Sequence, residues 1–492
     1  MLFNSIPFIF FFAVVYTIYW NIPKKLRQVF LTLSGIAFYA YYSVPLLIHF
    51  VIIIVLNYYL YYKIHTTKTK LYASLAVILN LVNLGFFKYF YFFTNFLGDI
   101  TRIAIFKQAP DLFHIALPLA ISFYSFQMIA AAVDEYRKPS QDLITFKNYL
   151  SFVLFFPVLI AGPIMRTNDF FPNFTRVNPE KDQIYRACYL MVSGLIKKVL
   201  IADPIALIIA PVYANPNEYS ALTIAMAAVF YAFQVYADFS GLTDMARSVA
   251  LFLGFEIPEN FYGSFFSTSA RELWKRWHAT LSFWLRDYIY FPLGGSRKGE
   301  FRTYINLLIT MTLGGLWHGA NYTYVAWGAY WGILLGLERY LEDKLHLPLT
   351  PKKSKVLMVI KAMIVFCFFS FSALMFRANN AESMIDLIVG VFSNNPMYLQ
   401  EQIMGVGGEW LIDGMGLVAS ETPFLMNTFK TYETVIYMFI LIFFFQVVQY
   451  KPETMDRFRK YDPILVPVLG VLTIFMLALL SQGGETFIYY QF

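Results

Sequence analysis

Long apolar stretches recur along the chain and are separated by short polar segments. Most of them approach the ~20 residues that an α-helix needs to cross a bilayer. We expect membrane crossings near residues 5–20, 28–43, 45–62, 72–94, 114–133, 188–211, 220–248, 303–319, 321–338, 356–376, 435–450 and 463–480. The pattern therefore predicts an all-α polytopic integral membrane protein with about 12 transmembrane helices.

The composition supports this interpretation. Hydrophobic residues make up 58% of the chain, aromatic residues 20% and charged residues 14%. Soluble domains have roughly a quarter charged residues, so this chain has too few to cover a water-facing surface. Its net charge of +7 comes from short Lys and Arg clusters between apolar stretches, which indicates a positive-inside bias and no nucleic-acid partner. Cys188 and Cys367 lie in apolar stretches and are interpreted as small core residues, with no disulfide between them.

Basic clusters alternate with loops that have few basic residues. The clusters follow the first, third and fifth predicted crossings and precede the last, at residues 24–27, 63–70, 137–147 and 457–460. By contrast, residues 393–431 contain a single basic residue, Lys430. Placing the basic loops in the cytoplasm makes 393–431 an external loop and puts both termini outside. The first 20 residues lack a basic start and a cleavage site, so they are predicted to be a retained membrane helix.

Two apolar segments do not fit this alternation. Basic residues flank residues 152–164 on both sides, and residues 274–292 are aromatic but interrupted by charged side chains. Irregular backbone at membrane depth is tolerated only where protein or water surrounds it, so both are predicted to be re-entrant segments. No repeat or inter-domain linker is visible. We therefore expect residues 1–492 to form a single membrane domain.

The chain has six histidines, and no two of them have the spacing of metal ligands, so no metal site is predicted. Motifs for phosphoryl transfer, serine hydrolysis and dinucleotide binding are missing from the sequence as well. His49 lies in an apolar stretch and fits a core position with satisfied hydrogen bonds. Surface or interfacial positions are expected for His65, His114 and His346.

His318 has a different setting, because it lies where two predicted crossings meet with no charged residue between them. An ionisable side chain at that depth is costly, which points to a function. Gly314, Gly315 and Gly319 permit close approach of the backbone, as a substrate tunnel requires. We expect a neutral imidazole there, able to act as general base toward a hydroxyl. A structural histidine, bonded to a tyrosine or a carbonyl, fits the same pattern.

The second re-entrant segment combines basic and aromatic side chains. Its cations Lys275, Arg276 and Arg286 could hold the phosphates of a nucleotide-type donor. Its aromatic residues Trp274 and Trp277 could stack on a flat ring or line an acyl slot. An interfacial helix that binds lipid headgroups is the alternative.

The block Arg-Glu-Leu-Trp-Lys-Arg-Trp-His, which ends at His278, precedes the element Trp-His-Gly around His318. Together with motifs at residues 159–166 and 234–246, they resemble the membrane-bound O-acyltransferase family. The similarity is greatest to its bacterial branch, which modifies alginate, peptidoglycan and teichoic acid, and it runs from the first predicted helix to the last residue. A location in the bacterial inner membrane is therefore expected.

The resemblance also implies roles for individual residues. His318 would be the catalytic histidine, and His278 would be a second histidine nearer the cytoplasmic side. A funnel would lead to His318, with the acyl donor coming from the cytoplasm. We expect Trp317 and Asn321, which flank His318, to contact substrate as well.

The last six residues, Phe-Ile-Tyr-Tyr-Gln-Phe, are similar to an aromatic C-terminal motif of the same branch. That similarity implies that Tyr489 takes the acyl group as a covalent relay. A phenol is a reasonable nucleophile once a base removes its proton. An interfacial aromatic anchor is the alternative. The presence of the motif within the chain argues against D-alanyl transfer, in which a separate peptide supplies it.

The predicted function is acyl transfer, with acetyl-CoA or an acyl carrier as donor and no bound cofactor. The acceptor would be a surface polysaccharide such as alginate or peptidoglycan, and membrane lipids surround the chain. A periplasmic SGNH-type acetyltransferase is expected as partner, since the chain has no Ser-His-Asp arrangement of its own. The alternatives are D-alanyl transfer to teichoic acid, a carrier of acyl or lipid groups, and a scaffold without catalysis. A carrier predicts internal repeats, and a scaffold gives His318 no role.

Overall fold

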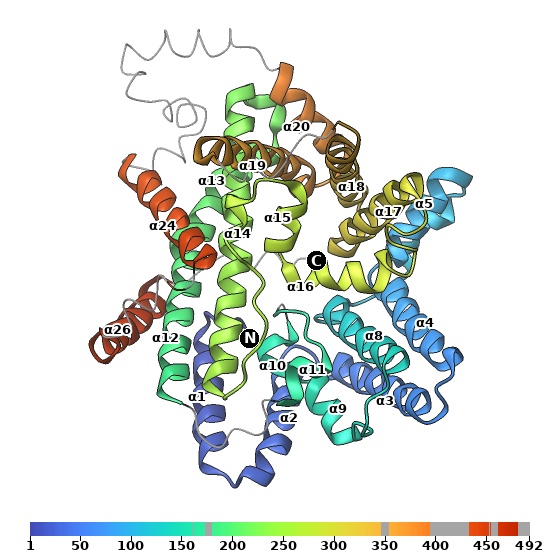
Figure 1. Cartoon of the computed structure of the whole chain (residues 1–492), viewed down its shortest axis with the longest axis vertical. Helices are drawn as coiled ribbons and strands as arrows, with labels where there is room; N and C mark the ends of the chain where they lie inside the picture. The colour runs from blue at the N-terminus through green and yellow to red at the C-terminus, as the bar shows by residue number, and fades with distance from the viewer. Residues whose placement is uncertain are drawn as a thin grey trace.

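The computed structural model of the chain describes residues 1–160, 162–172, 180–345, 354–393, 432–451, 453 and 461–480. Helices make up the regular structure of these residues, and no strand occurs among them (Figure 1). The predicted all-α class is therefore confirmed. Three predicted features lie outside the described residues: His346, the external loop beyond Ser393, and the C-terminal motif with Tyr489.

The helices follow one another with short connections. The first part contains α1 (Ile6–Asn21), α2 (Lys24–Ala40), α3 (Val44–Thr67), α4 (Lys70–Phe87), α5 (Phe90–Thr101), α6 (Ala104–Lys107), α7 (Ala109–Leu112), α8 (Ile121–Arg137), α9 (Phe146–Val153), α10 (Phe156–Leu159) and α11 (Thr167–Phe170). The middle part contains α12 (Lys181–Leu195), the π-helix η2 (Ile196–Ala202), α13 (Asp203–Ala214), η3 (Pro216–Glu218), α14 (Ala221–Phe252), η4 (Ser264–Phe266), α15 (Ala270–Arg276), α16 (Ala279–Leu285) and the π-helix η5 (Arg286–Tyr290). The last part contains α17 (Glu300–His318), α18 (Tyr322–Leu345), α19 (Lys355–Arg377), α20 (Ala381–Ser393), α24 (Tyr432–Tyr450) and α26 (Asp462–Leu480).

Four helices, α3, α4, α14 and α19, are long and apolar enough to cross a membrane. Shorter apolar helices lie at Ile6–Asn21, Tyr437–Tyr450 and Asp462–Val471. The predicted number of about 12 crossings is therefore not confirmed. One predicted crossing, 72–94, is interrupted where α4 ends at Phe87 and a turn at Lys88 leads into α5.

The predicted crossing at 188–211 is divided into α12, η2 and α13, and it contains buried charges. Lys197 donates to Asp244 at 2.6 Å, and Lys198 donates to Asp203 and Asp238 at 2.8 Å each. Only 1% of either lysine side chain is exposed. Such groups are tolerated within a membrane domain when they face its interior and are paired. This part of the chain is therefore an interior element, which hydropathy alone does not reveal.

Both segments that were predicted to be re-entrant consist of short, broken helices. Residues 152–164 contain the end of α9, the one-turn helix α10 and a turn, and they are almost entirely buried. Residues 274–292 contain α16 and η5 after the end of α15. The helices α15 and α16 lie near the middle of Figure 1, among the longer helices α8, α14, α17 and α18.

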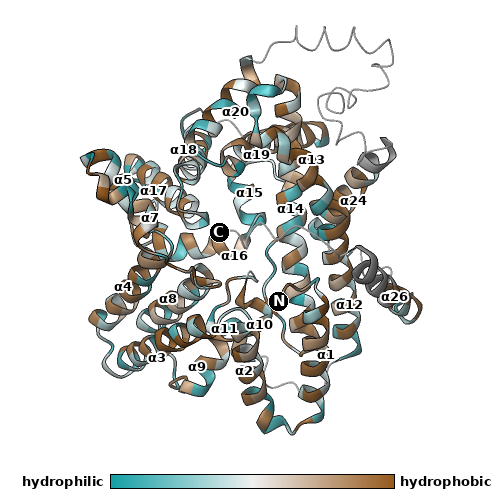
Figure 2. Ribbon diagram, turned by 180° about the vertical axis from the view of Figure 1, so that it is seen from behind, coloured by the Kyte–Doolittle hydropathy of each residue, from teal (hydrophilic) through white to brown (hydrophobic). Residues whose placement is uncertain are grey.

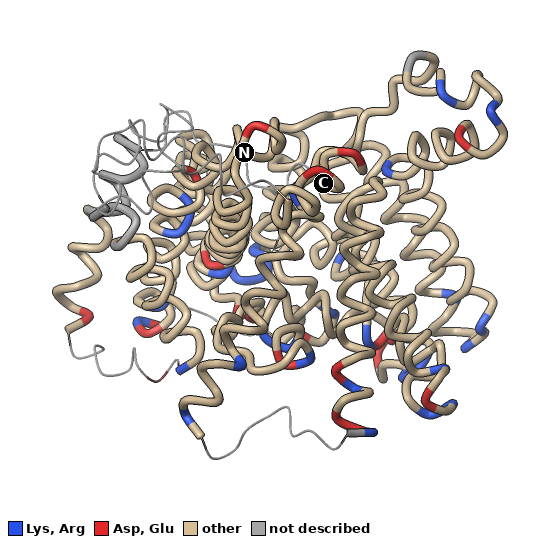
Figure 3. The backbone as a smooth tube through the Cα atoms, turned by 90° about the horizontal axis from the view of Figure 1, so that it is seen from above, with Lys and Arg blue, Asp and Glu red and all other residues tan. Residues whose placement is uncertain are grey.

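Hydrophobic residues make up much of the outer helices (Figure 2), and many of them are exposed. Phe10 on α1, Val82 on α4 and Val356 on α19 are among the large exposed hydrophobic residues. Cys367, on α19, is exposed as well, so the predicted core position is wrong for it, whereas Cys188 is half-buried. Lipid is the natural solvent for a surface of this kind. Charged side chains gather mainly along one side of the molecule, away from the N-terminal end (Figure 3).

Candidate active site

His318 is the last residue of α17, and its side chain is surrounded by aromatic rings. Only 4% of the residue is exposed. The ring centroids of Trp317, Trp327 and Phe376 lie 4.9, 5.3 and 5.1 Å from that of the imidazole. These residues come from α17, α18 and α19, so three helices fix the ring. The site thereby holds an ionisable group in mostly apolar surroundings.

The glycines near His318 serve helix packing. A Cβ atom on Gly315 would overlap the carbonyl oxygen of Tyr324, and one on Gly328 would overlap that of Met311. Helices α17 and α18 therefore approach each other closely through a small residue on each. Gly319 lines a cavity beside His318. The prediction that these glycines make room for substrate therefore fits Gly319, whereas Gly315 serves helix packing.

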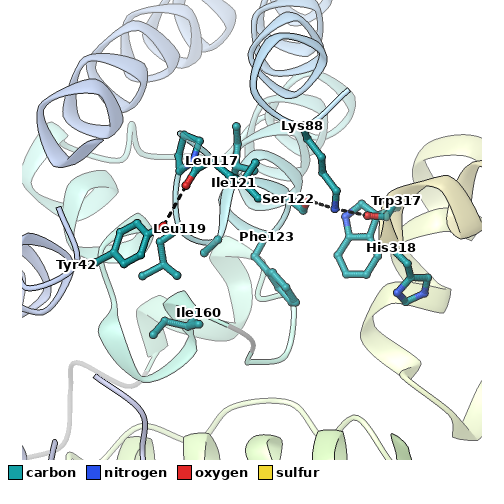
Figure 4. Close-up of a pocket in the computed structure, with 12 residues that line it drawn as sticks. Tyr42, Lys88, Leu117, Leu119, Ile121, Ser122, Phe123, Ile160, Trp317 and His318 are labelled. Atoms are coloured by element: carbon teal, nitrogen blue, oxygen red, sulfur yellow. Dashed lines mark hydrogen bonds between the residues drawn. The ribbon is translucent and has the colours of Figure 1, made fainter. Parts of the chain in front are cut away.

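The end of α17 is held by side chains from the break between α4 and α5. Lys88 Nζ donates to the Trp317 carbonyl oxygen at 2.6 Å and to Ser122 Oγ at 3.0 Å. Tyr89 OH donates to the Leu316 carbonyl oxygen at 2.9 Å. The last carbonyls of a helix have no partner within the helix itself, so these bonds from another part of the chain cap the C-terminal end of α17. Figure 4 shows Lys88 reaching from its helix toward Trp317, next to His318.

His278 lies on the other side of the Trp317 ring. Its ring centroid is 5.9 Å from that of Trp317 and 4.6 Å from that of Phe239. Its Nδ1 lies 3.4 Å from Asn260 Oδ1. The residue has a φ of 43°, which is uncommon for a residue with a side chain, and it begins α16. The two predicted catalytic histidines are therefore brought together around one tryptophan.

His318 lines two cavities, and a third begins at the next residue. One, of about 20 Å³, is mostly apolar, and its lining includes Trp277, Trp327 and Phe376. A second, of about 60 Å³, is shared by His318, Lys88 and Trp317 (Figure 4). A third, of about 500 Å³, begins at Gly319 and is polar. We call this third space the polar cavity; its lining includes Lys88, Tyr91, Tyr231, Gln234, Asn321, Tyr324 and Arg377.

Two of the predicted substrate-binding tryptophans pack near the site. Trp277 is 4% exposed and lines the 20 Å³ cavity. Trp274 packs edge-on against Trp327, with 5.6 Å between ring centroids, and so supports the wall behind that cavity. Asn321 lines the polar cavity, and its side chain donates to the Asn379 carbonyl oxygen at 2.9 Å.

The predicted substrate-binding cations have other surroundings. Arg276 is bonded to Glu272 at 2.9 Å, and its guanidinium lies 4.6 Å from the centroid of the Tyr450 ring. Arg286 is bonded to Asp287 at 2.7 Å, and Lys275 is exposed. None of these three lines a cavity beside His318. In the described part of the chain, they stand apart from the imidazole.

Sequence reasoning missed a second charged cluster on the same re-entrant segment. Arg166 donates to Asp287 at 2.7 Å, and Arg137 donates to the carbonyl oxygen of the same residue at 2.9 Å. Burial tends to raise the pKa of Asp287, but hydrogen bonds from Arg286 and Arg166 outweigh it and hold that pKa below its usual value. The cluster ties η5 to the chain near residues 137 and 166.

Lys88 was missed as well, although the sequence contained a signal for it. It lies inside an apolar stretch that was predicted to be one crossing, and a cation at such a position is itself a reason to expect function. Of the other histidines, His49 Nε2 contacts Asn83 Oδ1 at 3.0 Å, as expected of a core group. His65 is bonded to Glu135 at 2.7 Å and is less exposed than predicted, whereas His114 is exposed. No group of three or more His, Cys, Asp or Glu residues that could hold a metal ion gathers in the described ranges.

The sequence model of the membrane-bound O-acyltransferase family matches residues 8–378. The chain belongs to this family. The match includes His278, His318 and all the residues that line the cavities around them except Asn379. The resemblance seen in the sequence motifs is confirmed, and the protein is a multi-pass membrane acyltransferase.

Named relatives of this O-acyltransferase act on bacterial polymers. It is 37% identical to the probable alginate O-acetylase AlgI of Pseudomonas aeruginosa, over 82% of this chain and 76% of that protein. It is 32% identical to the peptidoglycan O-acetyltransferase of Helicobacter pylori, over 100% of this chain and 98% of that protein. The teichoic acid D-alanyltransferase of Streptococcus thermophilus is 29% identical over only 44% of this chain and 55% of its own length. The similarity to O-acetyltransferases is thus both higher and more extensive.

Proposed function

We propose that this O-acyltransferase moves an acetyl group from acetyl-CoA, on the cytoplasmic side, to an acceptor on the opposite side of the membrane. The product is O-acetylated surface polysaccharide, such as alginate or peptidoglycan. The observation that carries the proposal is the buried position of His318, which lines two small cavities and directly precedes Gly319, where a large polar cavity begins. The relatives that share most of this chain, an alginate O-acetylase and a peptidoglycan O-acetyltransferase, support the acetyl group and the class of polymer.

The chemistry assigned to His318 is general base catalysis. The imidazole takes the proton of an acceptor hydroxyl as the oxygen forms a bond to the acetyl carbonyl carbon. The carbon–sulfur bond of the thioester then breaks, and the proton passes to the leaving thiolate, giving coenzyme A and the acetyl ester. Such proton transfer typically contributes ~10²–10⁴-fold to the rate. The surrounding aromatic rings limit the access of water, which would compete with the acceptor.

The size of the apolar cavity favours acetyl over longer acyl groups. About 20 Å³ is enough for one water-sized group, which needs roughly 10–15 Å³ on the same measure. A methyl group is of comparable size, and the rings of Trp277, Trp327 and Phe376 close the cavity around it. Replacing Trp327 with alanine is therefore expected to admit propionyl and butyryl donors.

The two sides of the membrane are assigned from charge. The protein lies in the bacterial inner membrane. Its basic loops and the cluster around Asp287 face the cytoplasm, where the donor is, and both termini therefore lie in the periplasm. Phosphates of the donor meet Arg286 and Lys275, both at the exposed edge of the second re-entrant segment. Tyr489 takes the acetyl group at the site of His318 and carries it on the periplasmic side. An SGNH-type acetyltransferase there transfers it to the polymer.

The test uses membranes that contain the full chain and acetyl-CoA labelled in the acetyl group. We expect His318→Ala to lower acetylation of the polymer by at least about 100-fold, with the protein still present at normal level. His65→Ala serves as control, because that residue bonds to Glu135 and does not line any of these cavities. Full acetylation by His318→Ala would refute the catalytic role.

The relay is tested separately. Label is expected on the wild-type chain and absent from Tyr489→Phe, while the neighbouring Tyr490→Phe variant keeps it. Acetylated polymer without any label on the chain would remove Tyr489 from the pathway and leave His318 in place.

A further inference from the structure

Trp317 carries a buried hydrogen-bond donor that has no acceptor. The residue is 5% exposed, and among the described residues no acceptor lies within hydrogen-bonding distance of its indole Nε1 atom. A buried N–H group without a partner is costly, so such a group is usually bonded to protein, water or a ligand. The centroid of the Trp317 ring is 4.9 Å from that of the His318 ring. The unmatched donor therefore belongs to a ring in contact with the histidine to which we assign catalysis.

A small cavity adjoins this donor. Its volume is about 60 Å³, and Lys88, Trp317 and His318 all line it, so we call it the shared cavity. In Figure 4 the indole nitrogen lies on the edge of the ring next to Lys88, whose Nζ atom is 5.9 Å from the ring centroid. One water-sized group needs roughly 10–15 Å³ on the same measure, so the shared cavity has room for a few heavy atoms. No Asp or Glu residue lines it in the described part of the chain.

Lys88 brings a second donor to the shared cavity. An ammonium group has three N–H bonds, and Lys88 directs two of them to Ser122 Oγ at 3.0 Å and to the Trp317 carbonyl oxygen at 2.6 Å. Both partners are neutral, so the positive charge favours an anionic group nearby. The bond to the Trp317 carbonyl also holds the two residues together. Two donors, one of them charged, are thus kept in a fixed arrangement beside His318.

The proposed transfer generates an anion that His318, as a base, does not stabilise. When the acceptor oxygen bonds to the acetyl carbon, one electron pair of the C=O double bond moves to the carbonyl oxygen, which becomes an oxyanion. When that pair returns, the C–S bond breaks, and the thiolate leaves and takes the proton held by His318. Donors that already point at the oxyanion lower the barrier, because they need no reorganisation during the reaction. The reaction therefore calls for fixed N–H donors next to the histidine.

We propose that the Nε1–H group of Trp317 and the ammonium group of Lys88 bind the carbonyl oxygen of the acetyl group in the shared cavity and stabilise the oxyanion. The methyl group then occupies the apolar cavity of about 20 Å³, which His318 also lines. Both residues are catalytic in this assignment, because they touch a reacting atom. The assignment rests on the proposed acetyl transfer at His318, and it adds the groups that stabilise the transition state of that transfer.

The indole donor is tested by removing its N–H group from the full chain in membranes. Trp317→Phe should lower kcat for the His318-dependent release of thiol from acetyl-CoA by about 10²-fold, the typical cost of one oxyanion donor. The KM for acetyl-CoA should stay unchanged, because the bond strengthens in the transition state. Trp331→Phe is the matched control, since it removes an indole that is also buried and unmatched but lines none of the three cavities. Equal kcat for the wild type and Trp317→Phe, or an equal fall in both variants, would overturn the proposal.

A second variant separates the N–H group from the packing of the ring. Benzothienylalanine, incorporated in place of Trp317, keeps the size and flat shape of the indole but has sulfur where the N–H group was. We expect the same loss of kcat as in Trp317→Phe, although the ring still packs against His318 and Phe126. Full activity of the benzothienyl protein would refute the role of the donor, even if Trp317→Phe fails to fold.

Lys88 is tested against a residue that shares its structural task. Lys88 and Tyr89 both bond to carbonyl oxygens at the end of α17, but Tyr89 does not line the shared cavity. Lys88→Gln should lower kcat at least about tenfold, the equivalent of one hydrogen bond from a charged group, whereas Tyr89→Phe should leave kcat nearly unchanged. An equal fall in both variants would overturn the assignment for Lys88, which would then be a positioning residue.

A spectroscopic measurement reads the hydrogen bond without turnover. Acetyl-CoA with an isotopic label in the carbonyl carbon is bound to the purified full chain with His318→Ala in detergent, and infrared difference spectra record its C=O stretch. Donation to the carbonyl oxygen weakens the double bond, so the band should move to a higher wavenumber when Trp317→Phe is added. Trp331→Phe should leave the band in place. An unchanged band with Trp317→Phe would refute the assignment.

The proposed function is read separately, as release of thiol from acetyl-CoA by the otherwise unaltered chain. If His318→Ala keeps that release, the acetyl transfer is refuted, whereas the carbonyl band of the bound donor still reports whether Trp317 donates to it. If the release depends on His318 but neither kcat nor the band responds to Trp317→Phe, the oxyanion assignment alone fails.

Discussion

The buried Lys197 and Lys198 and the half-buried Lys88 lie in different parts of this membrane domain, and their surroundings differ in kind. Lys197 and Lys198 are each bonded to aspartate side chains at 2.6–2.8 Å. Lys88 is bonded to a hydroxyl and a carbonyl, and it lines a cavity without acidic residues. A charge matched by opposite charges is the usual sign of a structural role, whereas a charge left to neutral partners beside a cavity is available to a ligand. Lys197 and Lys198 are buried and Lys88 is half-buried, so the two groups differ in exposure as well as in what surrounds the cation.

The largest effect is expected from breaking the paired group. Lys198→Met leaves Asp203 and Asp238 without their cation, so the protein should lose ~3–5 kcal/mol of stability. Lys107→Met, which breaks an exposed pair, should cost ~0–1 kcal/mol. Thermal unfolding of both variants in detergent measures the contrast. If Lys198→Met kept its stability but lost activity, the paired group would belong to the reaction and the comparison would fail.

A second large effect is expected where packing holds the site. Gly315→Ala forces α17 away from α18 and displaces His318, and a shift of ~1 Å at a reacting group can cost 10²-fold in rate. Gly336→Ala, on the same helix pair, is the matched control, because its Cβ would meet only the Tyr304 ring at 3.5 Å. The measurement is the rate of acetylation by each variant in membranes that contain equal amounts of protein. Equal rates for the two variants would mean that the close approach is not needed.

A smaller effect is expected at His278. This residue packs against Trp317 and does not line the three cavities, so we assign it a positioning role. His278→Asn preserves the left-handed backbone, which asparagine tolerates, and should lower kcat about fivefold, the equivalent of one hydrogen bond of ~1 kcal/mol. The KM for acetyl-CoA should stay unchanged. A fall as large as that of His318→Ala would make His278 a catalytic residue instead.

The smallest effect concerns the cluster around Asp287 at the exposed edge. The pKa of the Asp287 carboxyl is lowered in the folded state, because burial raises it but Arg286 and Arg166 lower it more. The carboxylate therefore stabilises the fold above its unfolded pKa, and this stabilisation is lost as the pH falls through the folded value, below about pH 4. Asp287→Asn should remove this part of the pH dependence of the unfolding free energy, which amounts to ~1 kcal/mol. Asp99→Asn should retain it. Identical acid profiles for Asp287→Asn and the wild type would contradict the assignment.

Much of the fold and part of the site could be predicted from the sequence, for physical reasons. Hydropathy reports how apolar a segment is, so it located most helices, and the depth of His318 identified the centre of the site. It does not report which neighbours surround a helix. For that reason α12–α13 and the stretch around Lys88 were predicted to be plain crossings, although the first contains two buried cations and the second a half-buried one.

The motif around Trp277 and His278 shows the same limit. Its basic and aromatic residues were assigned to substrate as a group, because they are adjacent in the sequence. In the fold, successive residues of α15 and α16 point in different directions. Trp277 reaches the cavity beside His318, while Arg276 turns to Glu272 and Tyr450.

The bond between Lys88 and Trp317 joins residues 229 positions apart, and this distance has a consequence for biosynthesis. Lys88 leaves the ribosome long before α17 exists, so for most of translation its ammonium group lacks the carbonyl that it binds in the finished protein. A lone cation at that depth disfavours insertion. The N-terminal helices should therefore settle late, when α17 arrives. Chains truncated before residue 317 are expected to be degraded faster than chains truncated after α18.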